Sequence, residues 1–243
     1  MNLKKLDNNM NFQEVKEKLK VIPHLKLGKI DISSLIQKEI DNIPKFYDYE
    51  RPGDDKEKYK LYANSWKVVG LIDSTQDPSL AAKDGRSYQG SNSFGNGGVL
   101  TEIGKMMPNT LNLVYNLVEA PMRVRISKFV PKGHLHWHSH NQYNSGNYIN
   151  TEYFKGVLHI PLRTNKNVKF GVTKFPIENY GINPIWQHYD VGEIWLFNSW
   201  EMHNIFNDGD SDRIHIMFYF NFFDKKIISL LKEKVEEYKG PFL

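Results

Sequence analysis

Four histidines stand at alternate positions in the segment PKGHLHWHSHNQ, residues 131–142: His134, His136, His138 and His140. Imidazole is a good ligand for iron, zinc and copper, and side chains two positions apart on a strand point to the same face. If the segment is extended, all four rings share one face and a pair of them can bind one metal ion. A run of solvated histidines is the alternative, and it applies most to His134 and His136.

A metal site built on such a pair needs a ligand from elsewhere in the chain. His203, in SWEMHNIFNDGDSDRIHI, lies 65 residues after His138, and Arg213 follows ten residues later at the head of an apolar segment. This spacing is typical of non-haem iron oxygenases that use 2-oxoglutarate. Three protein ligands leave open positions on Fe(II) for the keto acid and O2. The planar guanidinium of an arginine matches the remote carboxylate of the keto acid.

The elements that position these groups differ between the two halves of the chain. Residues 11–22 and 31–43 predict amphipathic helices. The first places Phe12, Val15, Leu19 and Val21 near one face; the second begins with Asp31 as N-cap and repeats Leu35, Ile36, Ile40 and Ile43. Residues 67–72 predict a short strand, and 100–118 a helix interrupted by Pro108. The polar, glycine-rich residues 73–98 predict a disordered segment or a surface loop, or alternatively a lid or binding loop.

From residue 122 onward, short apolar or alternating segments recur between Gly, Asn, Asp and Pro, which predicts a β-sandwich or barrel. These segments are 122–130, 156–164, 167–173, 192–198, 202–207 and 212–222. Residues 224–239 predict a closing amphipathic helix with Ile227, Leu230, Leu231 and Val235 on one side. We expect one α+β domain over 1–243: a mainly helical and loop part (1–120), a jelly-roll core (121–223) and the C-terminal helix. A jelly roll brings the two histidine segments together.

Composition narrows the class of protein. The 243 residues are 40% hydrophobic and 13% aromatic, so the chain should be globular, and no apolar run approaches the length of about 20 residues that spans a bilayer. Cysteine is absent, which excludes disulfides and thiolate metal sites. The net charge of +4 is scattered and forms no basic stripe of the kind that binds nucleic acid. We expect a cytoplasmic protein with no nucleic-acid or membrane partner.

Four segments carry a family resemblance when taken in order. VPKGHLHWHSH, VLHIPLRT, VGEIWLFNSWEMHNIFN and DRIHIMFYF, within residues 122–221, resemble the aspartyl/asparaginyl β-hydroxylase family, which includes free-proline hydroxylases. The resemblance implies a double-stranded β-helix (jelly-roll, cupin-like) fold. It also implies an Fe(II)- and 2-oxoglutarate-dependent hydroxylase, a dioxygenase that consumes O2 and acts on an amino acid or a peptide or protein side chain.

The resemblance assigns roles to five residues. His138 becomes the first metal ligand, His203 the distal ligand and Arg213 the clamp for the remote carboxylate of 2-oxoglutarate. Ser127 and His159 match positions that contact the co-substrate. The alternative for Ser127 is a plain strand serine, and for His159 a hydrogen-bonded core histidine.

His140 departs from the family pattern, because the proline-hydroxylase branch has Asp at this position. It is a third nitrogen ligand, or it turns away and leaves two histidines and water, or the register shifts and His136 and His138 form the pair. An all-histidine site also suits zinc. The alternative function is therefore a cupin-like metal-binding protein without 2-oxoglutarate chemistry, such as a sensor or another dioxygenase.

Neighbouring residues are secondary candidates. His215 alternates with Arg213 and so shares its face, either lining the pocket or packing in the core. Arg125 shares a strand face with Ser127; it meets an anion or a carboxylate if that face is internal, and solvent if it is an edge. Asn207 is expected to shape a turn. Core or pocket-wall packing is expected of Trp137, Trp195 and Trp200.

Overall fold

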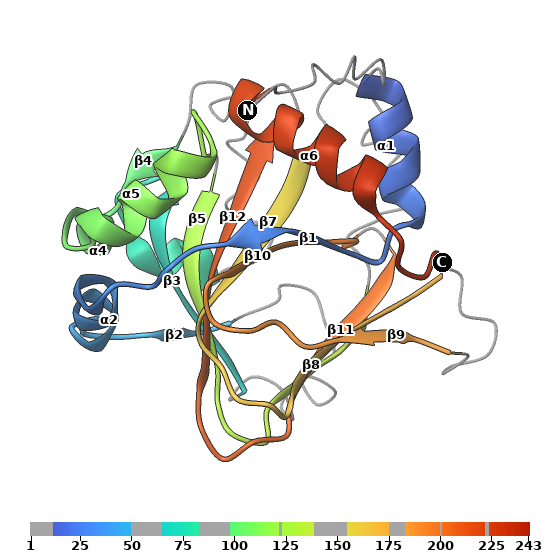
Figure 1. The fold of residues 1–243 in the computed structure, drawn as a ribbon. Helices are drawn as coiled ribbons and strands as arrows, with labels where there is room; N and C mark the ends of the chain where they lie inside the picture. The colour runs from blue at the N-terminus through green and yellow to red at the C-terminus, as the bar shows by residue number, and fades with distance from the viewer. Residues whose placement is uncertain are drawn as a thin grey trace.

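The computed structural model describes residues 12–49, 65–82, 98–121, 123–138, 155–174, 183–199, 201–221 and 224–243. Two antiparallel sheets dominate it (Figure 1). The central strands of the large sheet are β10 (Glu193–Phe197), β7 (Lys155–Arg163), β12 (Arg213–Asn221) and β5 (Arg123–Phe129), in this order. The small sheet has the order β6 (His134–His138), β11 (Met202–Asn207), β8 (Val168–Thr173) and β9 (Ile185–Gln187).

These eight strands form a double-stranded β-helix. From β5 to β8 the chain alternates between the large and the small sheet, and after β9 it alternates again up to β12. The two sheets enclose a hydrophobic cluster that includes Phe129, Phe170, Trp195 and Ile205. The protein is therefore an α+β protein with the predicted jelly-roll, cupin-like core.

The N-terminal half adds strands to both sides of the large sheet. β1 (His24–Lys29) pairs with β10, and β3 (Trp66–Asp73) pairs with β5 on the opposite side. Two short strands, β2 (Tyr47–Asp48) and β4 (Val99–Leu100), flank β3. The sequence predicted only the strand at 67–72. β1 escaped notice because its side chains are buried without a regular alternation, so no period of two marks it.

Helices cover the outer face of the large sheet. α1 (Phe12–Val21) and α6 (Lys225–Glu237) pack together at one end, and α2 (Ser34–Asp41), α4 (Glu102–Lys105) and α5 (Pro108–Leu117) cluster at the side (Figure 1). A short 3-10 helix, η1 (Pro78–Ala82), packs on β3. The second hydrophobic cluster fills the space between helices and sheet, so this sheet is buried on both faces. Successive side chains of its strands therefore point alternately toward the helical layer and toward the jelly-roll interior.

The helix predictions hold in outline and fail in three details. The helix predicted over 100–118 is interrupted at Pro108, as expected, and Pro108 occupies the first turn of α5, where its missing N–H is not needed. The N-cap of α2 is Ser33, whose hydroxyl accepts from the Ile36 amide at 3.3 Å, and not Asp31. Val21 is 41% exposed and Leu35 is 56% exposed, so neither faces the core.

The phase of each helix explains the two exposed side chains. In α1 the buried face runs through Val15, Leu19 and then Ile22, a spacing that keeps residues on one side, whereas Val21 points away. In α2 the buried positions are Ile36 and Ile40. In α6 they are the predicted Ile227, Leu231 and Val235, whereas the predicted Leu230 is only partly buried.

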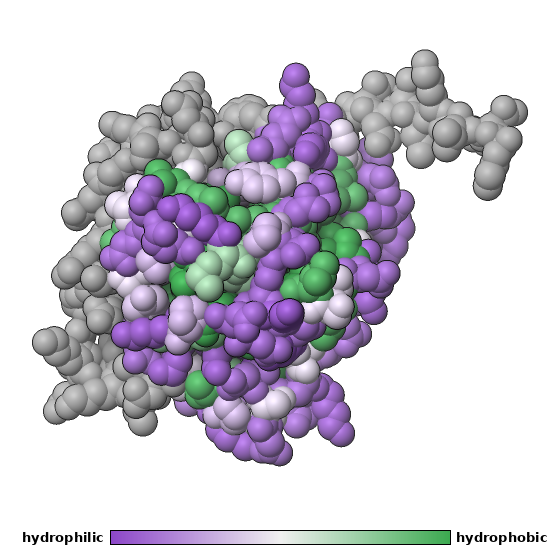
Figure 2. Space-filling view, turned by 90° about the vertical axis from the view of Figure 1, so that its left-hand side faces the viewer, coloured by the Kyte–Doolittle hydropathy of each residue, from purple (hydrophilic) through white to green (hydrophobic). Residues whose placement is uncertain are grey.

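The outer surface over α2, α4 and α5 is mixed in polarity. Figure 2 shows hydrophilic side chains over most of this face, with separate hydrophobic patches between them. Exposed apolar residues from these elements include Leu35 in α2 and Met106 just after α4. Across the described residues, no helix combines the length and apolar character that a membrane span requires.

Candidate active site

Two of the predicted metal ligands face each other across the small sheet. His138 ends β6, and its partner on the adjacent strand β11 is His203. Their ring centroids are 4.1 Å apart, at an angle of 53°. Sixty-five residues separate them in the chain, so this approach depends on the antiparallel pairing of β6 and β11. At this separation both imidazoles can bind the same metal ion.

His203 is oriented by its backbone surroundings. The ring is buried, and its Nδ1 lies 2.9 Å from the carbonyl oxygen of Glu201. A carbonyl only accepts, so Nδ1 must carry the proton and Nε2 must carry the lone pair. Metal-binding histidines are commonly held in this way, with one nitrogen donating to a carbonyl and the other directed at the ion.

A β-bulge changes the face on which the first histidine lies. Leu135 pairs with Ile205 and His138 with His203, so two residues of β6 lie opposite the single Asn204 of β11. Beyond this bulge His134 pairs with Phe206 and stacks on its ring at 5.8 Å. The expectation that all four histidines share one face is therefore wrong for His134, because the extra residue reverses the alternation.

The third metal position is not defined by the described residues. His140 and the side chain of His136 lie outside them, as does Trp200. Within the described ranges, no group of three or more His, Cys, Asp or Glu side chains gathers closely enough to hold an ion. The three alternatives for His140 stay predictions. The donor set that is present, two adjacent imidazoles with one tautomer fixed, fits Fe(II).

Arg213 lies in the jelly-roll interior, and no carboxylate of the described residues pairs with it. It is fully buried at the start of β12, and no described Asp or Glu forms an ion pair with it. Its guanidinium faces the rings of Phe129 and Phe170, at 5.2 and 4.9 Å. Its Nε has no hydrogen-bond partner among the described residues. Burial lowers the pKa of Arg213 to about 9, because a charge removed from water is costly unless an anion accompanies it.

Ser127 lies beside Arg213, as the sequence predicted. The two come from the neighbouring strands β5 and β12, and Ser127 Oγ accepts from Arg213 Nη1 at 3.4 Å. The indole Nε1 of Trp66 donates to the same oxygen at 2.8 Å. Ser127 is fully buried, so its hydroxyl orients the guanidinium from the interior face of the sheet.

His159 occupies the interior between the histidine pair and Arg213. It lies on β7, fully buried, and its ring is 4.7 Å from Phe197, which in turn is 5.0 Å from His203. On the other side its ring is 6.1 Å from that of His215. The position matches the predicted contact with a co-substrate, and that role stays a prediction.

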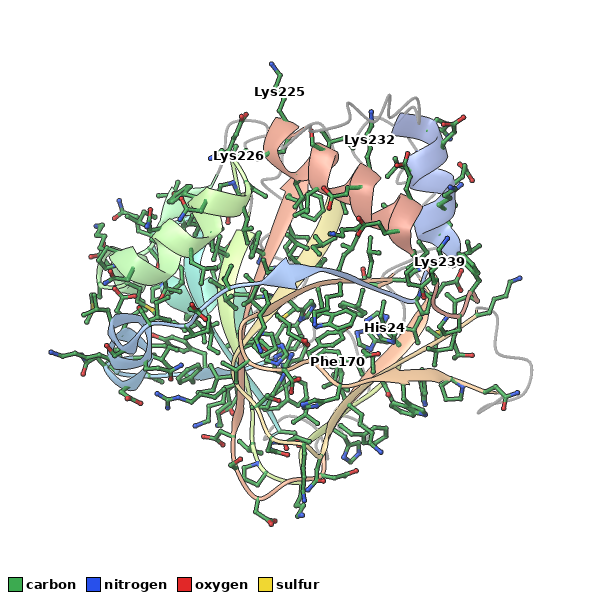
Figure 3. All side chains as sticks on the ribbon, viewed as in Figure 1. His24, Phe170, Lys225, Lys226, Lys232 and Lys239 are labelled. Carbon is green, nitrogen blue, oxygen red and sulfur yellow. The ribbon has the colours of Figure 1, made fainter. Side chains whose placement is uncertain are left out.

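A stack of aromatic rings forms the wall behind Arg213. Tyr189 stacks on Phe170 at 4.1 Å and on Trp195 at 4.6 Å. Its hydroxyl donates to Nδ1 of His24 at 2.7 Å, and His24 Nε2 donates to the Ile185 carbonyl at 3.0 Å. Figure 3 shows His24 and Phe170 inside the molecule, between the sheets. Burial lowers the pKa of His24 to about 4 and raises that of Tyr189 well above its usual range.

The sequence alone did not single out His24 or Tyr189. His24 is the one histidine of the N-terminal half and stands in no recognisable motif. Tyr189 lies in the short connection between β9 and β10. Only the pairing of β1 with β10 brings His24 to the interior, so the order of residues along the chain carried no signal for this contact.

Two secondary candidates have clear environments. Arg125 is buried, donates to the Tyr219 hydroxyl at 3.2 Å and lies among the rings of Tyr49, Trp66 and Tyr219, so its solvent-facing alternative is wrong. Asn207 shapes a turn, as predicted: its side-chain amide donates to three backbone carbonyl groups, at 2.9 to 3.2 Å.

Comparisons with known protein families and solved structures identify the family and similar folds. Residues 31–221, more than three quarters of the chain, match the family described as Aspartyl/Asparaginyl beta-hydroxylase. No curated protein sequence matches the chain. A similar solved structure is an oxidoreductase of the 2OG-Fe(II) oxygenase family from Burkholderia pseudomallei, with 12% identity, a TM-score of 0.43, and coverage of 90% of this chain and 95% of that one. Another is a cupin domain from Bordetella pertussis Tohama I, with 14% identity, a TM-score of 0.27, and coverage of 40% and 77%.

Proposed function

Because the chain belongs to the aspartyl/asparaginyl β-hydroxylase family, we propose that it is an Fe(II)- and 2-oxoglutarate-dependent hydroxylase of an amino acid or a peptidyl side chain. One observation carries the proposal beyond family membership. The same jelly-roll interior holds a pair of facing histidines and, separately, a buried arginine that no described carboxylate neutralises. A metal and a dicarboxylate are the two groups that this arrangement suits.

His138 and His203 would hold the iron. The fixed tautomer of His203 directs one nitrogen lone pair at the ion, and His138 approaches from the adjacent strand. His140 follows on the same segment and is the proposed third ligand. When bound, Fe(II) supplies the redox chemistry by which O2 and 2-oxoglutarate hydroxylate a C–H bond and yield succinate and CO2.

Arg213 would bind the remote carboxylate of 2-oxoglutarate. Its planar guanidinium is already oriented by Ser127 and His215, so little side-chain freedom is lost on binding. His159 lies between this arginine and the histidine pair, where it would contact the middle of the keto acid.

The aromatic wall excludes water from this interaction. Phe170, Tyr189 and Trp195 are buried and stacked beside the guanidinium. In such a low-dielectric environment an ion pair between Arg213 and a carboxylate is stronger than at the surface.

A metal- and ligand-binding assay on the full chain tests the proposal. Purified protein should bind Fe(II), and anaerobic addition of 2-oxoglutarate should produce the weak visible charge-transfer band of a bound keto acid; O2 should then produce succinate. His138→Ala should lose the metal. His134→Ala is the matched control on the same strand, because that ring stacks on Phe206 and not on His203, and it should retain the metal.

Two outcomes would contradict the proposal. Metal binding without any 2-oxoglutarate binding would favour the cupin-like alternative. Equal loss of metal in both histidine variants would show that the facing pair is not the site.

A further inference from the structure

Asn198 is a buried polar residue to which the proposed chemistry assigns no role. It follows β10 directly and lies five residues before His203, in the connection that leads to β11. The residue is only 7% exposed. Buried amide groups are normally held by hydrogen bonds, and the partners of this one connect α1 with the proposed metal ligand His203.

On one side, the Asn198 side chain reaches His203 through a single residue. Its Oδ1 accepts from the backbone amide of Glu201 at 3.3 Å, and the carbonyl oxygen of Glu201 accepts from Nδ1 of His203 at 2.9 Å. A side-chain oxygen that binds the amide three residues later restricts the backbone between them, as a helix N-cap does. The Glu201 carbonyl is therefore held in one direction, and so is the imidazole ring that donates to it.

On the other side, Asn198 is fastened to the end of α1. Its Nδ2 donates to the carbonyl oxygens of Lys20 at 2.8 Å and Leu19 at 3.3 Å, both in the last turn of this helix. These are among the carbonyl groups that a helix leaves without an internal partner at its C-terminal end. The backbone amide of Asn198 also donates to the carbonyl of Pro23, just beyond the helix, at 2.9 Å.

The two sets of partners allow only one orientation of the amide group. Carbonyl oxygens only accept, so Nδ2 must face α1, and a backbone N–H only donates, so Oδ1 must face Glu201. A flipped amide would lose the contacts on both sides. Asn198 is therefore a rigid bridge between α1 and the residue whose carbonyl orients His203.

We propose that Asn198 is a positioning residue for the metal site, which fixes the tautomer and ring orientation of His203 through the backbone of Glu201. The inference rests on the proposed function and deepens it, because it names what orients one of the proposed iron ligands. The proton on Nδ1 of His203 leaves the lone pair of Nε2 for the metal. Removing groups that hold a ligating histidine typically lowers metal affinity by about 10- to 100-fold.

Two substitutions at Asn198 separate positioning from general stability. Asn198→Ala removes both the acceptor for the Glu201 amide and the donor to the α1 carbonyls. Asn198→Asp keeps an acceptor for the Glu201 amide but turns a carboxylate toward the C-terminal carbonyls of α1, where a negative charge is unfavourable. Asn198→Asp should therefore be at least as unstable as Asn198→Ala, yet only Asn198→Ala should disturb His203.

Binding of Mn(II) to the full-length protein provides the measurement. The EPR signal of free Mn(II) gives the Kd, at a temperature where urea unfolding shows that each variant is folded. Asn198→Ala should weaken binding about tenfold, whereas Asn198→Asp should bind Mn(II) at least as tightly as the wild type. Asn207→Ala is the matched control and should keep the wild-type Kd, because Asn207 also donates to backbone carbonyls but lies at the far end of β11 from His203.

The other outcomes distinguish failure of the proposed function from failure of this inference. If the wild type binds no Mn(II), or if His138→Ala binds it as tightly as the wild type, the proposed function fails and this inference fails with it. If the wild type binds Mn(II) and Asn198→Ala binds it equally well, only the inference fails. Equal weakening by the two substitutions at Asn198, or by Asn207→Ala, would show a purely structural role and would also overturn it.

NMR measurements on the wild type test the inference if Asn198→Ala does not fold. At a pH where the ring is neutral, long-range proton–nitrogen correlation should show a protonated Nδ1 and an unprotonated Nε2 in His203. Hydrogen exchange of the Glu201 amide should be slow, and Asn198→Asp should preserve both features. The opposite tautomer, or a Glu201 amide that exchanges as fast as in an unfolded chain, would overturn the inference.

Discussion

Replacing Arg213 by methionine should stabilise the ligand-free protein and abolish its response to 2-oxoglutarate. Arg213 is fully buried, and no described carboxylate pairs with it. Its lowered pKa, about 9, measures how strongly the interior disfavours the charged form. Methionine has a similar length, no charge and enough flexibility to fill the space.

The magnitude follows from opposing contributions. The depressed pKa corresponds to a penalty of about 5 kcal/mol on the charged side chain. Below pH 9 the guanidinium is charged in both the folded and the unfolded chain, so the penalty is present in full at neutral pH and decreases only as pH rises through about 9. The variant loses hydrogen bonds to Ser127 and His215, about 1 kcal/mol each, and aromatic contacts of about 1 kcal/mol. The net gain should be about 2 kcal/mol.

Urea unfolding at pH 7.5, with and without 2-oxoglutarate and a divalent metal, checks this prediction. At a ligand concentration about 100 times its Kd, the wild type should gain about 2.7 kcal/mol, and Arg213→Met should gain almost nothing. Arg163→Met is a matched control, because Arg163 donates to Asp41 at 2.6 Å near the surface and should change stability by no more than about 1 kcal/mol.

A large loss of stability in Arg213→Met would refute the reasoning. Removing one member of a buried ion pair typically costs about 3 to 5 kcal/mol, because the partner is left charged and buried. Such a loss would show that Arg213 already has an anionic partner within the chain, and that it is not kept for a ligand.

Three further predictions concern the framework of the site. The pKa of His24 is about 4 in the folded protein and 6.5 ordinarily, so the stability that depends on its neutral ring is complete above pH 6.5 and is lost as pH falls toward 4. Between pH 7.5 and 5 the free energy of unfolding of the wild type, measured in urea, should therefore fall by about 2 kcal/mol more than that of His24→Asn. The same pH dependence in both proteins would contradict this prediction. Asn207→Ala leaves three backbone carbonyl groups without their side-chain donor and should cost about 2 to 3 kcal/mol by the same method; a cost below about 1 kcal/mol would show that solvent replaces the amide. Gly104→Ala should lower the free energy of unfolding by about 2 kcal/mol, measured by thermal unfolding, because a Cβ at this position would lie 2.1 Å from the Leu71 carbonyl oxygen. This clash should outweigh the higher helix propensity of alanine. A gain in stability would show that α4 is not packed against β3.

Local patterns in the sequence were sufficient for most of the secondary structure. The six apolar segments after residue 122 all became strands, because alternation in the chain reflects alternation between two buried layers. Pro108 divided two helices because it lacks an amide hydrogen. In α6 the helical spacing identified the buried face. Each of these features depends on neighbours a few residues away.

The ordered motifs also identified the residues that the fold brings together. The spacing of His138, His203 and Arg213, with the family resemblance, predicted one site, and the structure places the two histidines on paired strands and the arginine in the same interior. Arg125 could not be decided in this way, since an inward and an edge position share the same alternating pattern. The pairing of β3 with β5 settled it, because β5 is then an inner strand of the sheet and not an edge.

Only the tertiary structure decided the remaining features, because each depends on how distant segments meet. The bulge opposite Asn204 places His134 and His138 on opposite faces of the small sheet. No local sequence pattern predicts the extra residue that causes this bulge. His24 reaches Tyr189 only through the pairing of β1 with the sheet. Arg213 donates to Nδ1 of His215 at 2.7 Å, which places the proton of that ring on Nε2. A sequence states which donors and charges a chain carries, whereas only the folded arrangement shows which of them lack a partner.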